Sequence, residues 1–187
     1  MATGTLVRVA VPDRHRGVDE ALADAIRSAQ YGDMLAMHDV LDAVAEPVRR
    51  WCGPIALQDS ADAVQETLVI VLRRLGELRE PAALFGWVRT IAVREAIRVA
   101  RHAARTVPYE LDDIPAPGDP ALTVEVHDVL AQLSPEHRAV LMLRDMDGFD
   151  EPTAAAVLSV PEGTVRSRLF RARQAFRRLW QADGGAR

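Results

Sequence analysis

The sequence predicts an all-α fold made of two small helical domains that are joined by a flexible acidic linker. Aromatic residues make up only 5% of the 187 residues, and β-branched residues are few beside the total of Ala, Leu, Arg and Glu. This composition favours helices over sheets. Apolar residues recur at spacings of three and four along most of the chain, which is the pattern of amphipathic helices. A stretch rich in proline and acidic residues interrupts that pattern and separates the two domains.

These observations divide the chain into five predicted segments. In order they are a leader, a first helical domain, the acidic linker, a second helical domain and a short tail: 1–16, 17–106, 107–122, 123–182 and 183–187. The linker contains four prolines and four acidic residues between positions 107 and 121, so it is predicted to be extended and to bury little surface.

Composition and charge exclude several classes of protein. Apolar residues form 49% of the chain and charged residues 27%, a balance that excludes an intrinsically disordered protein. No apolar run approaches the length of a membrane-spanning helix. The net charge of −4 argues against a protein that coats nucleic acid without specificity. All 23 basic residues are arginine, the residue better suited to paired contacts with phosphate and guanine.

No cofactor, metal site or disulfide is predicted. Cys52 is the only cysteine, which excludes an internal disulfide and a cysteine-based zinc site. It is predicted to be a buried, small apolar residue. The histidines lack the spacing of metal ligands. The first residues lack the charged and apolar segments of a secretion signal, so a cytoplasmic protein is predicted.

The first domain is predicted to contain four helices. A first helix ends near Gly32, and a second is kinked or split by Pro47 and ended by Gly53–Pro54. The third helix starts from a predicted N-cap at Ser60. It has the clearest apolar stripe of the chain, with spacings of four and three: Val64, Leu68, Val71, Leu75 and Leu78.

The fourth predicted helix, 83–104, carries a stripe of arginines at spacings of four, three and four: Arg94, Arg98, Arg101 and Arg105. At 100° per residue these side chains fall within about 60° of one another. Four like charges on one face repel each other, so this face is predicted to bind a polyanion.

The second domain shows strong helix-start signals. Ser134 followed by Pro135 predicts the start of one helix, and Asp150 predicts the cap of a short alanine-rich helix, 151–158. After a turn, Pro161 opens the last helix. Its inward stripe is predicted to be Val165, Leu169, Ala172, Phe176 and Leu179.

The end of the chain therefore matches a helix-turn-helix, with a short helix, a tight turn and a longer helix with an arginine-rich front. The side chains predicted to reach base edges lie at the start of the last helix: Thr164, Arg166, Ser167 and Arg168. Arg171 and Arg173 lie further along and suit phosphates. The alternative is an amphipathic packing helix with solvated arginines, but 166–178 contains six arginines and no acid.

These residues resemble a known family. Residues 133–144 (LSPEHRAVLMLR) and 163–173 (GTVRSRLFRAR) are similar to the region-four domain of bacterial sigma factors. The resemblance is to the extracytoplasmic-function (ECF) type, which has two folded domains. Independently, residues 62–67 (DAVQET) and 85–94 (FGWVRTIAVR) resemble two helices of region two. The resemblance covers about 20–180, including the linker.

The resemblance implies a transcription initiation factor and not an enzyme. Its implied partners are core RNA polymerase (the β′ clamp helices and the β subunit), promoter DNA and, as a candidate, an anti-sigma factor, with no membrane insertion. Polymerase would dock on exposed side chains of the third helix region: Asp62, Gln65, Glu66, Arg73 and Arg74. The −10 element would contact Phe85, Trp87, Arg94, Arg98 and Arg101. The helix-turn-helix side chains would read the −35 element.

Two other functions stay open at this point. A stand-alone helix-turn-helix regulator would bind duplex DNA tightly without polymerase, usually as a dimer, although no obvious dimerisation helix is present. The other is a polymerase-binding protein whose DNA surface has decayed. Glu95 places a negative charge beside the predicted DNA face, and Ser159 stands where a glycine is common in the turn.

Overall fold

A computed structural model describes residues 17–103 and 120–182. The predicted leader, tail and most of the linker, together with Arg105, lie outside the described residues. The described residues are arranged as helices joined by short turns, without a β-strand. The predicted all-α fold is confirmed.

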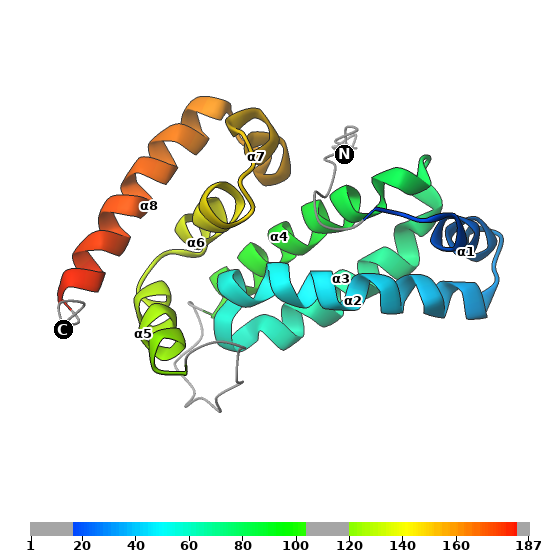
Figure 1. The fold of residues 1–187 in the computed structure, drawn as a ribbon, viewed down its shortest axis with the longest axis horizontal. Helices are drawn as coiled ribbons and strands as arrows, with labels where there is room; N and C mark the ends of the chain where they lie inside the picture. The colour runs from blue at the N-terminus through cyan, green and yellow to red at the C-terminus, as the bar shows by residue number, and fades with distance from the viewer. Residues whose placement is uncertain (1–16, 104–119, 183–187) are drawn as a thin grey trace.

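The first helical group comprises four α-helices and three short 3₁₀ turns. The helices are α1 (Glu20–Gln30), α2 (Met34–Ala56), α3 (Ser60–Arg74) and α4 (Leu84–Ala103). The 3₁₀ turns are Leu57–Asp59, Leu75–Glu77 and Pro81–Ala83. The long helix α2 packs against α1, α3 and α4 (Figure 1).

The core of this group is built from the apolar faces that the periodicity predicts. Val44, Val48 and Trp51 of α2 and Val88 of α4 are fully buried and belong to the same core. On α3 the predicted apolar stripe is buried at Val71. The stripe continues into the 3₁₀ turn that follows α3. Cys52 is also buried, as predicted, and burial raises the pKa of its thiol to about 12.

The helix α2 continues through Pro47 and Pro54, so the prediction that Gly53–Pro54 ends this helix is wrong. A proline inside a helix removes one backbone hydrogen bond. Ile55, directly after the second proline, is fully buried, and this packing stabilises the helix beyond the missing bond. The helix stops before Leu57, whose φ of +54° turns the chain away from the axis.

The helix α3 begins at Ser60, one position before the predicted start. Asp59 occupies the cap position and makes no side-chain cap hydrogen bond. The preceding residues already form a 3₁₀ turn, so the chain enters α3 in a nearly helical conformation and a Ser60 cap is not used.

The second helical group holds the predicted helix-turn-helix. Its elements are α5 (Pro120–Ala131), α6 (Pro135–Leu141), a π-helical turn (Met142–Met146), α7 (Glu151–Leu158) and α8 (Glu162–Ala182). The start of α5 lies inside the range predicted as linker, so the helical part begins earlier than expected. Ser134 accepts a hydrogen bond from the His137 N–H, and Asp150 accepts one from the Thr153 N–H. Both residues therefore cap their helices, as predicted.

The turn between α7 and α8 depends on Ser159. Its φ of 54° and ψ of 47° place it in the left-handed region, where glycine is usual and a side chain costs about 1 kcal/mol. The Ser159 N–H donates to the last carbonyls of α7, which satisfies the helix end.

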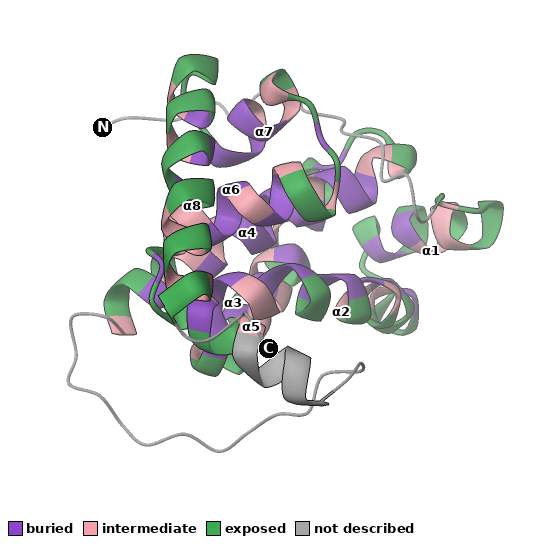
Figure 2. Ribbon diagram, turned by 60° about the vertical axis from the view of Figure 1, so that its left-hand side comes forward, coloured by how far each residue is buried: buried purple, intermediate pink, exposed green. Residues whose placement is uncertain are grey.

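The two helical groups pack directly against each other. Helix α6 contacts both α2 and α4, and α7 contacts α4. In Figure 2 the buried faces of α4 and α6 lie next to each other. The buried side chains of both groups therefore form one continuous core.

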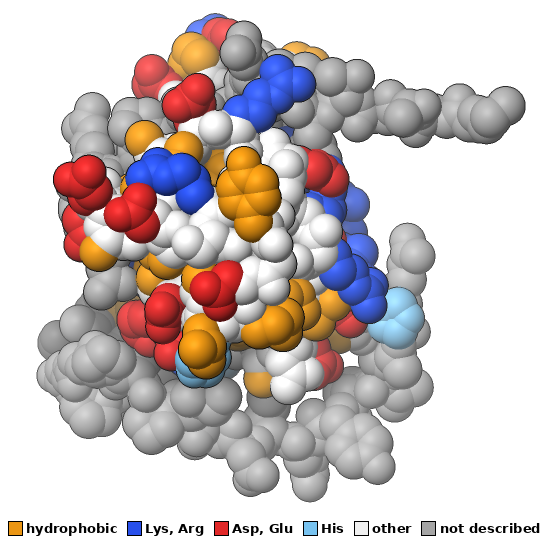
Figure 3. Space-filling view, turned by 90° about the vertical axis from the view of Figure 1, so that its right-hand side faces the viewer, with side chains coloured by type: hydrophobic (Ala, Val, Ile, Leu, Met, Phe, Trp, Pro, Cys, Tyr) orange, Lys and Arg blue, Asp and Glu red, His pale blue; other side chains and the backbone are white. Residues whose placement is uncertain are grey.

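A group of exposed apolar side chains lies at the turn between α1 and α2. Tyr31, Met34 and Leu35 are 94%, 74% and 80% exposed, and Figure 3 views the molecule from this end. The neighbouring Gln30 donates hydrogen bonds to two carbonyls in the segment after α3. This turn is thus attached to that segment while its apolar side chains face solvent.

Candidate nucleic-acid and polymerase interfaces

The front of α8 is a surface of exposed arginines over an apolar back. Val165, Leu169 and Ala172 are buried against α6 and α7, as the periodicity predicts. Three arginines and a serine of the predicted set are exposed, and the other two residues are half-buried. The exposed members are Arg166, Ser167, Arg171 and Arg173, and the half-buried ones are Thr164 and Arg168.

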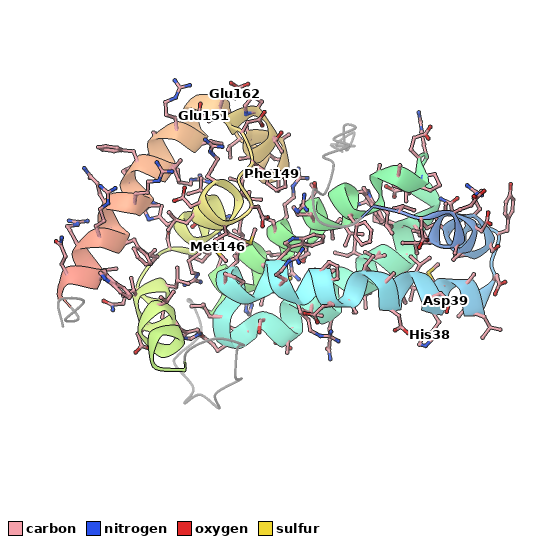
Figure 4. All side chains as sticks on the ribbon, viewed as in Figure 1. His38, Asp39, Met146, Phe149, Glu151 and Glu162 are labelled. Atoms are coloured by element: carbon pink, nitrogen blue, oxygen red, sulfur yellow. The ribbon has the colours of Figure 1, made fainter. Side chains whose placement is uncertain are left out.

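Two of these arginines are held by carboxylates of the preceding elements. The Arg166 guanidinium bonds both carboxylate oxygens of Glu151, at 2.7 and 3.2–3.3 Å, and this hydrogen bond holds the pKa of Glu151 below its ordinary value. Figure 4 labels Glu151 near the start of α8. Arg173 pairs with Asp145 at 2.5 Å. Exposed ion pairs of this kind add little to stability, so both guanidinium groups can exchange their carboxylate partners for another anion.

Arg171 has a different local arrangement. Its Nε donates to the Ser167 carbonyl at 3.2 Å, one helical turn earlier. The side chain therefore lies along the front of α8, where it suits a phosphate better than a base edge.

The arginine stripe of α4 faces the second helical group. Arg94 is half-buried and donates to the Val157 and Ala156 carbonyls at 2.9 and 3.0 Å, and burial lowers its pKa. Arg101 forms an ion pair with Glu136 of α6. The sequence gives no sign of these contacts, because the partners lie 35 or more positions away.

A pocket of about 550 Å³ opens where α4 meets the second group. Among the described residues, most of its polar lining is cationic and Glu136 is the one carboxylate. The described lining residues are Arg94, Ile97, Arg98, Arg101, His102, Glu136, Leu158, Val160 and Arg168. The pocket therefore brings together residues predicted to contact two different promoter elements.

The aromatic residues predicted to contact the −10 element are less accessible than the arginines. Phe85 is 3% exposed and belongs to the core. This corrects the expectation that its ring is free to stack on a base, because the start of α4 turns it inward. Trp87 is half-buried and packs against the same core.

The predicted docking face of α3 is open to solvent. Its exposed members are Asp62, Gln65, Glu66 and Arg73, while Arg74 is half-buried and pairs with Glu77 at 2.6 Å. Val69 and Leu72, which the sequence analysis did not single out, are 38% and 42% exposed. Their spacing of three, off the inward stripe, is the signal that would have found them.

The described residues contain no group of three or more His, Cys, Asp or Glu side chains arranged to hold a metal ion. Within the same ranges, 17–103 and 120–182, none of the helices has the length and apolar character needed to cross a membrane.

Comparison with known proteins defines the class of the second helical group. Residues 123–176 match the family model described as "Sigma-70, region 4". These residues include α6, α7 and most of α8, so the helix-turn-helix is a region-four domain.

Relatives that match more of the chain than this domain extend the result. The RNA polymerase sigma-H factor of Pseudomonas aeruginosa is 32% identical, with 66% of this chain and 74% of the relative covered. The ECF RNA polymerase sigma factor SigM of Mycobacterium tuberculosis is 33% identical, with 65% and 64% covered. The ECF RNA polymerase sigma-E factor of Haemophilus influenzae is 27% identical, with 83% and 92% covered. The chain belongs to the extracytoplasmic-function RNA polymerase sigma factors.

Two solved structures share the fold. One is the sigma factor RpoE in complex with the anti-sigma factor NepR from Bartonella quintana, with a TM-score of 0.63, 23% identity and coverage of 78% of this chain and 97% of that one. The other is CnrH in complex with the cytosolic domain of CnrY, with a TM-score of 0.59, 24% identity and coverage of 88% and 99%. Both support the two-domain helical architecture.

The predicted family and function are thereby confirmed: the chain is a sigma factor of transcription initiation. The stand-alone regulator is not favoured, since the relatives match both helical groups and not the helix-turn-helix alone. Sigma factors act as initiation factors rather than as enzymes.

Proposed function

We propose that this sigma factor docks on core RNA polymerase through α3, engages the −10 element with α4 and reads the −35 element with α8. The single observation that carries the proposal is the exposed arginine front of α8 over its buried apolar back. This is the geometry that places the start of a recognition helix in a major groove.

The docking surface combines charge with apolar area. Glu66 and Arg73 lie on the exposed face of α3 with Val69 and Leu72 between them. Burying two part-exposed apolar side chains supplies favourable free energy, and the charges supply orientation and specificity. The proposed partner surface is the β′ clamp helices, with the β subunit contacting the second helical group.

Contacts to the −10 element are proposed for Arg98, Arg101 and Trp87 of α4, of which the two arginines are exposed and Trp87 is half-buried. Arg98 is exposed and pairs with Glu95 at 2.6 Å, a weak surface pair that a phosphate can replace. Arginine and aromatic side chains are the groups that hold unpaired bases and their backbone.

The same reasoning extends to the partners and location. An anti-sigma factor is a proposed partner, supported by the fold shared with RpoE, which was solved in complex with the anti-sigma factor NepR. A factor that works with RNA polymerase and promoter DNA is proposed to act in the cytoplasm.

A run-off transcription assay with core polymerase tests the proposal. We expect the chain to direct specific initiation at a cognate promoter only when core polymerase is present. Tight duplex binding without polymerase would instead indicate a stand-alone regulator. Polymerase binding without any promoter-specific transcript would indicate a decayed DNA surface.

Reversing the charge of Glu66 is expected to weaken binding to core polymerase. Glu66→Arg should cost more than about 1 kcal/mol of binding free energy if this carboxylate is desolvated at the interface. The free energy of unfolding should change by less than about 0.5 kcal/mol, since the side chain is exposed. Binding is measured by fluorescence titration, and stability by thermal unfolding.

The matched control is Glu20→Arg, the same charge change in the exposed first turn of α1. It should leave polymerase affinity unchanged. Equal affinity of wild type and Glu66→Arg would place the polymerase interface on another surface.

A further inference from the structure

The pocket beside α4 carries more positive than negative charge. Where the structure describes the chain, the lining of this pocket of about 550 Å³ holds four arginines and one carboxylate, that of Glu136. Three of the arginines belong to α4 and the fourth, Arg168, belongs to α8. A volume of this size lies within the range of small-molecule sites, about 300–1,000 Å³. The pocket therefore combines the size of a nucleotide site with an excess of positive charge.

The carboxylate of Glu136 lies between arginines from two helices. It forms an ion pair with Arg101 of α4, and the positive charge of Arg168 of α8 also attracts it. The Glu136 side chain is only 19% exposed. The polar side of the pocket is thus arranged around one negative charge, so an anion is stable at this position.

One carboxylate does not neutralise this side of the pocket. Arg94 is half-buried and donates to two neutral carbonyls at the end of α7, so its guanidinium is held in place while its charge is kept. Arg101 and Arg168 share Glu136, and Arg98 has a carboxylate partner of its own on α4. Three arginines facing one carboxylate leave two positive charges for a ligand.

The other side of the pocket is apolar. It is formed by Ile97 of α4 and by Leu158 and Val160 at the turn between α7 and α8. Leu158 is buried, and the other two side chains are half-buried. Covering them with an apolar or planar group is favourable. A ligand that carries both an anionic and a planar part would therefore use both sides.

Phosphate is the anion that suits these arginines best. A guanidinium binds phosphate oxygens in pairs, with charge-assisted hydrogen bonds. Two uncompensated positive charges match a group with at least two negative charges, such as a diphosphate. A DNA duplex is too wide to enter a pocket of this volume between packed helices, whereas a single nucleotide fits.

We propose that this pocket binds a phosphorylated small molecule of nucleotide size. Its phosphate groups are held by Arg94, Arg101 and Arg168, and the rest of the molecule lies against Ile97. Because Glu136 competes with the phosphate groups for two of these arginines, it limits the affinity. The site goes beyond the polymerase and promoter contacts proposed above and does not depend on them.

Isothermal titration calorimetry of the full free chain tests the site near physiological ionic strength. The probes are ADP, inorganic diphosphate and adenosine, without Mg²⁺, whose charge would offset that of the phosphates. We expect saturable binding of ADP and none of adenosine. Absence of saturable ADP binding would overturn the proposal.

Inorganic diphosphate identifies the part of the ligand that is recognised. Equal affinities for diphosphate and ADP would support a site for the diphosphate group, and tighter binding of ADP would add a contact between the nucleoside and the apolar side. Binding of diphosphate without binding of ADP would show a site for an inorganic ion only, and the nucleotide-sized site would be wrong.

Replacing Arg101 with alanine should weaken ADP binding by about tenfold or more, because a charge-assisted hydrogen bond is lost. The matched control is Arg49→Ala on α2. Arg49 is 61% exposed and pairs with Glu46, whereas Arg101 is 59% exposed and pairs with Glu136. The control should bind ADP within about twofold of wild type. Equal weakening by both variants would mean that ADP is attracted by the overall charge, and it would contradict the pocket.

Replacing Glu136 with glutamine should act in the opposite direction and raise ADP affinity by about threefold or more, because it removes the competing negative charge. A damaged fold would lose affinity, so a gain cannot come from misfolding. Glu46→Gln, the control, removes a carboxylate that is 75% exposed and should change nothing. Unchanged or weaker ADP binding by a folded Glu136→Gln variant would overturn the proposal. These titrations contain neither DNA nor polymerase, so their failure is distinguishable from a failure of run-off transcription.

Discussion

Replacing Trp51 with alanine is expected to lower the free energy of unfolding by about 3–5 kcal/mol, the range for deleting a large buried aromatic side chain. Trp51 is fully buried in the centre of the first helical group and also contacts the Arg89 guanidinium. The substitution leaves a cavity in the core beside α2 and removes one of the rings that contact the buried Arg89 guanidinium. Both effects act in the same direction.

The measurement is guanidinium unfolding followed by circular dichroism, which does not depend on tryptophan fluorescence. Trp51→Phe keeps an aromatic ring over Arg89 and should cost less than the alanine variant. Leu35→Ala, at a side chain 80% exposed, should cost less than about 0.5 kcal/mol. A loss below about 1 kcal/mol for Trp51→Ala would mean that α2 does not pack through this residue.

Replacing Arg166 with alanine is expected to cost about 1–3 kcal/mol of binding at a cognate −35 element and to relax preference at one base pair. Arg166 follows the buried Val165 in the first turns of α8, so its side chain points away from the core. The ion pair with Glu151 orients the guanidinium in the free chain. Guanine presents two acceptors that a guanidinium can bond together.

Promoter-complex formation on a small library of −35 variants measures this effect. Arg177→Ala, further along α8, should cost less and should act evenly across the library. The affinity for core polymerase should be unchanged by both substitutions, because neither lies on α3. An equal loss on every −35 sequence would make Arg166 a phosphate contact, and no loss at all would mean that α8 is not the DNA reader.

Trp51 and Arg166 are different kinds of residue. Trp51 packs in the core, so replacing it should lower the free energy of unfolding. Arg166 is exposed and lies outside the core, so its effect should appear in DNA binding with little change in stability. Measuring both quantities on both variants separates folding from recognition.

Features that depend on neighbours within about one helical turn could be predicted before the structure was known. Spacings of three and four along one helix predict the buried stripe of α8 and the exposed face of α3. The residue types at the helix starts predict the Ser134 and Asp150 caps. The family could also be predicted, because its motifs are short and local. The exposed Val69 and Leu72 were within reach of the same reasoning, since they lie off the inward stripe of a predicted helix.

Contacts between residues that are far apart in the chain could not be predicted and depend on how the helices pack. The continuation of α2 past Pro54 depends on burial of Ile55, and the inward position of Phe85 depends on the packing of α4 into the core. Arg89 and Arg138 look like ordinary charged positions in the sequence, yet each is buried by groups far away in the chain. Periodicity describes which face of a helix is apolar, but contacts between helices depend on how whole faces fit together. The packing of α6 and α7 against α4 is therefore a property of the fold and not of any one motif.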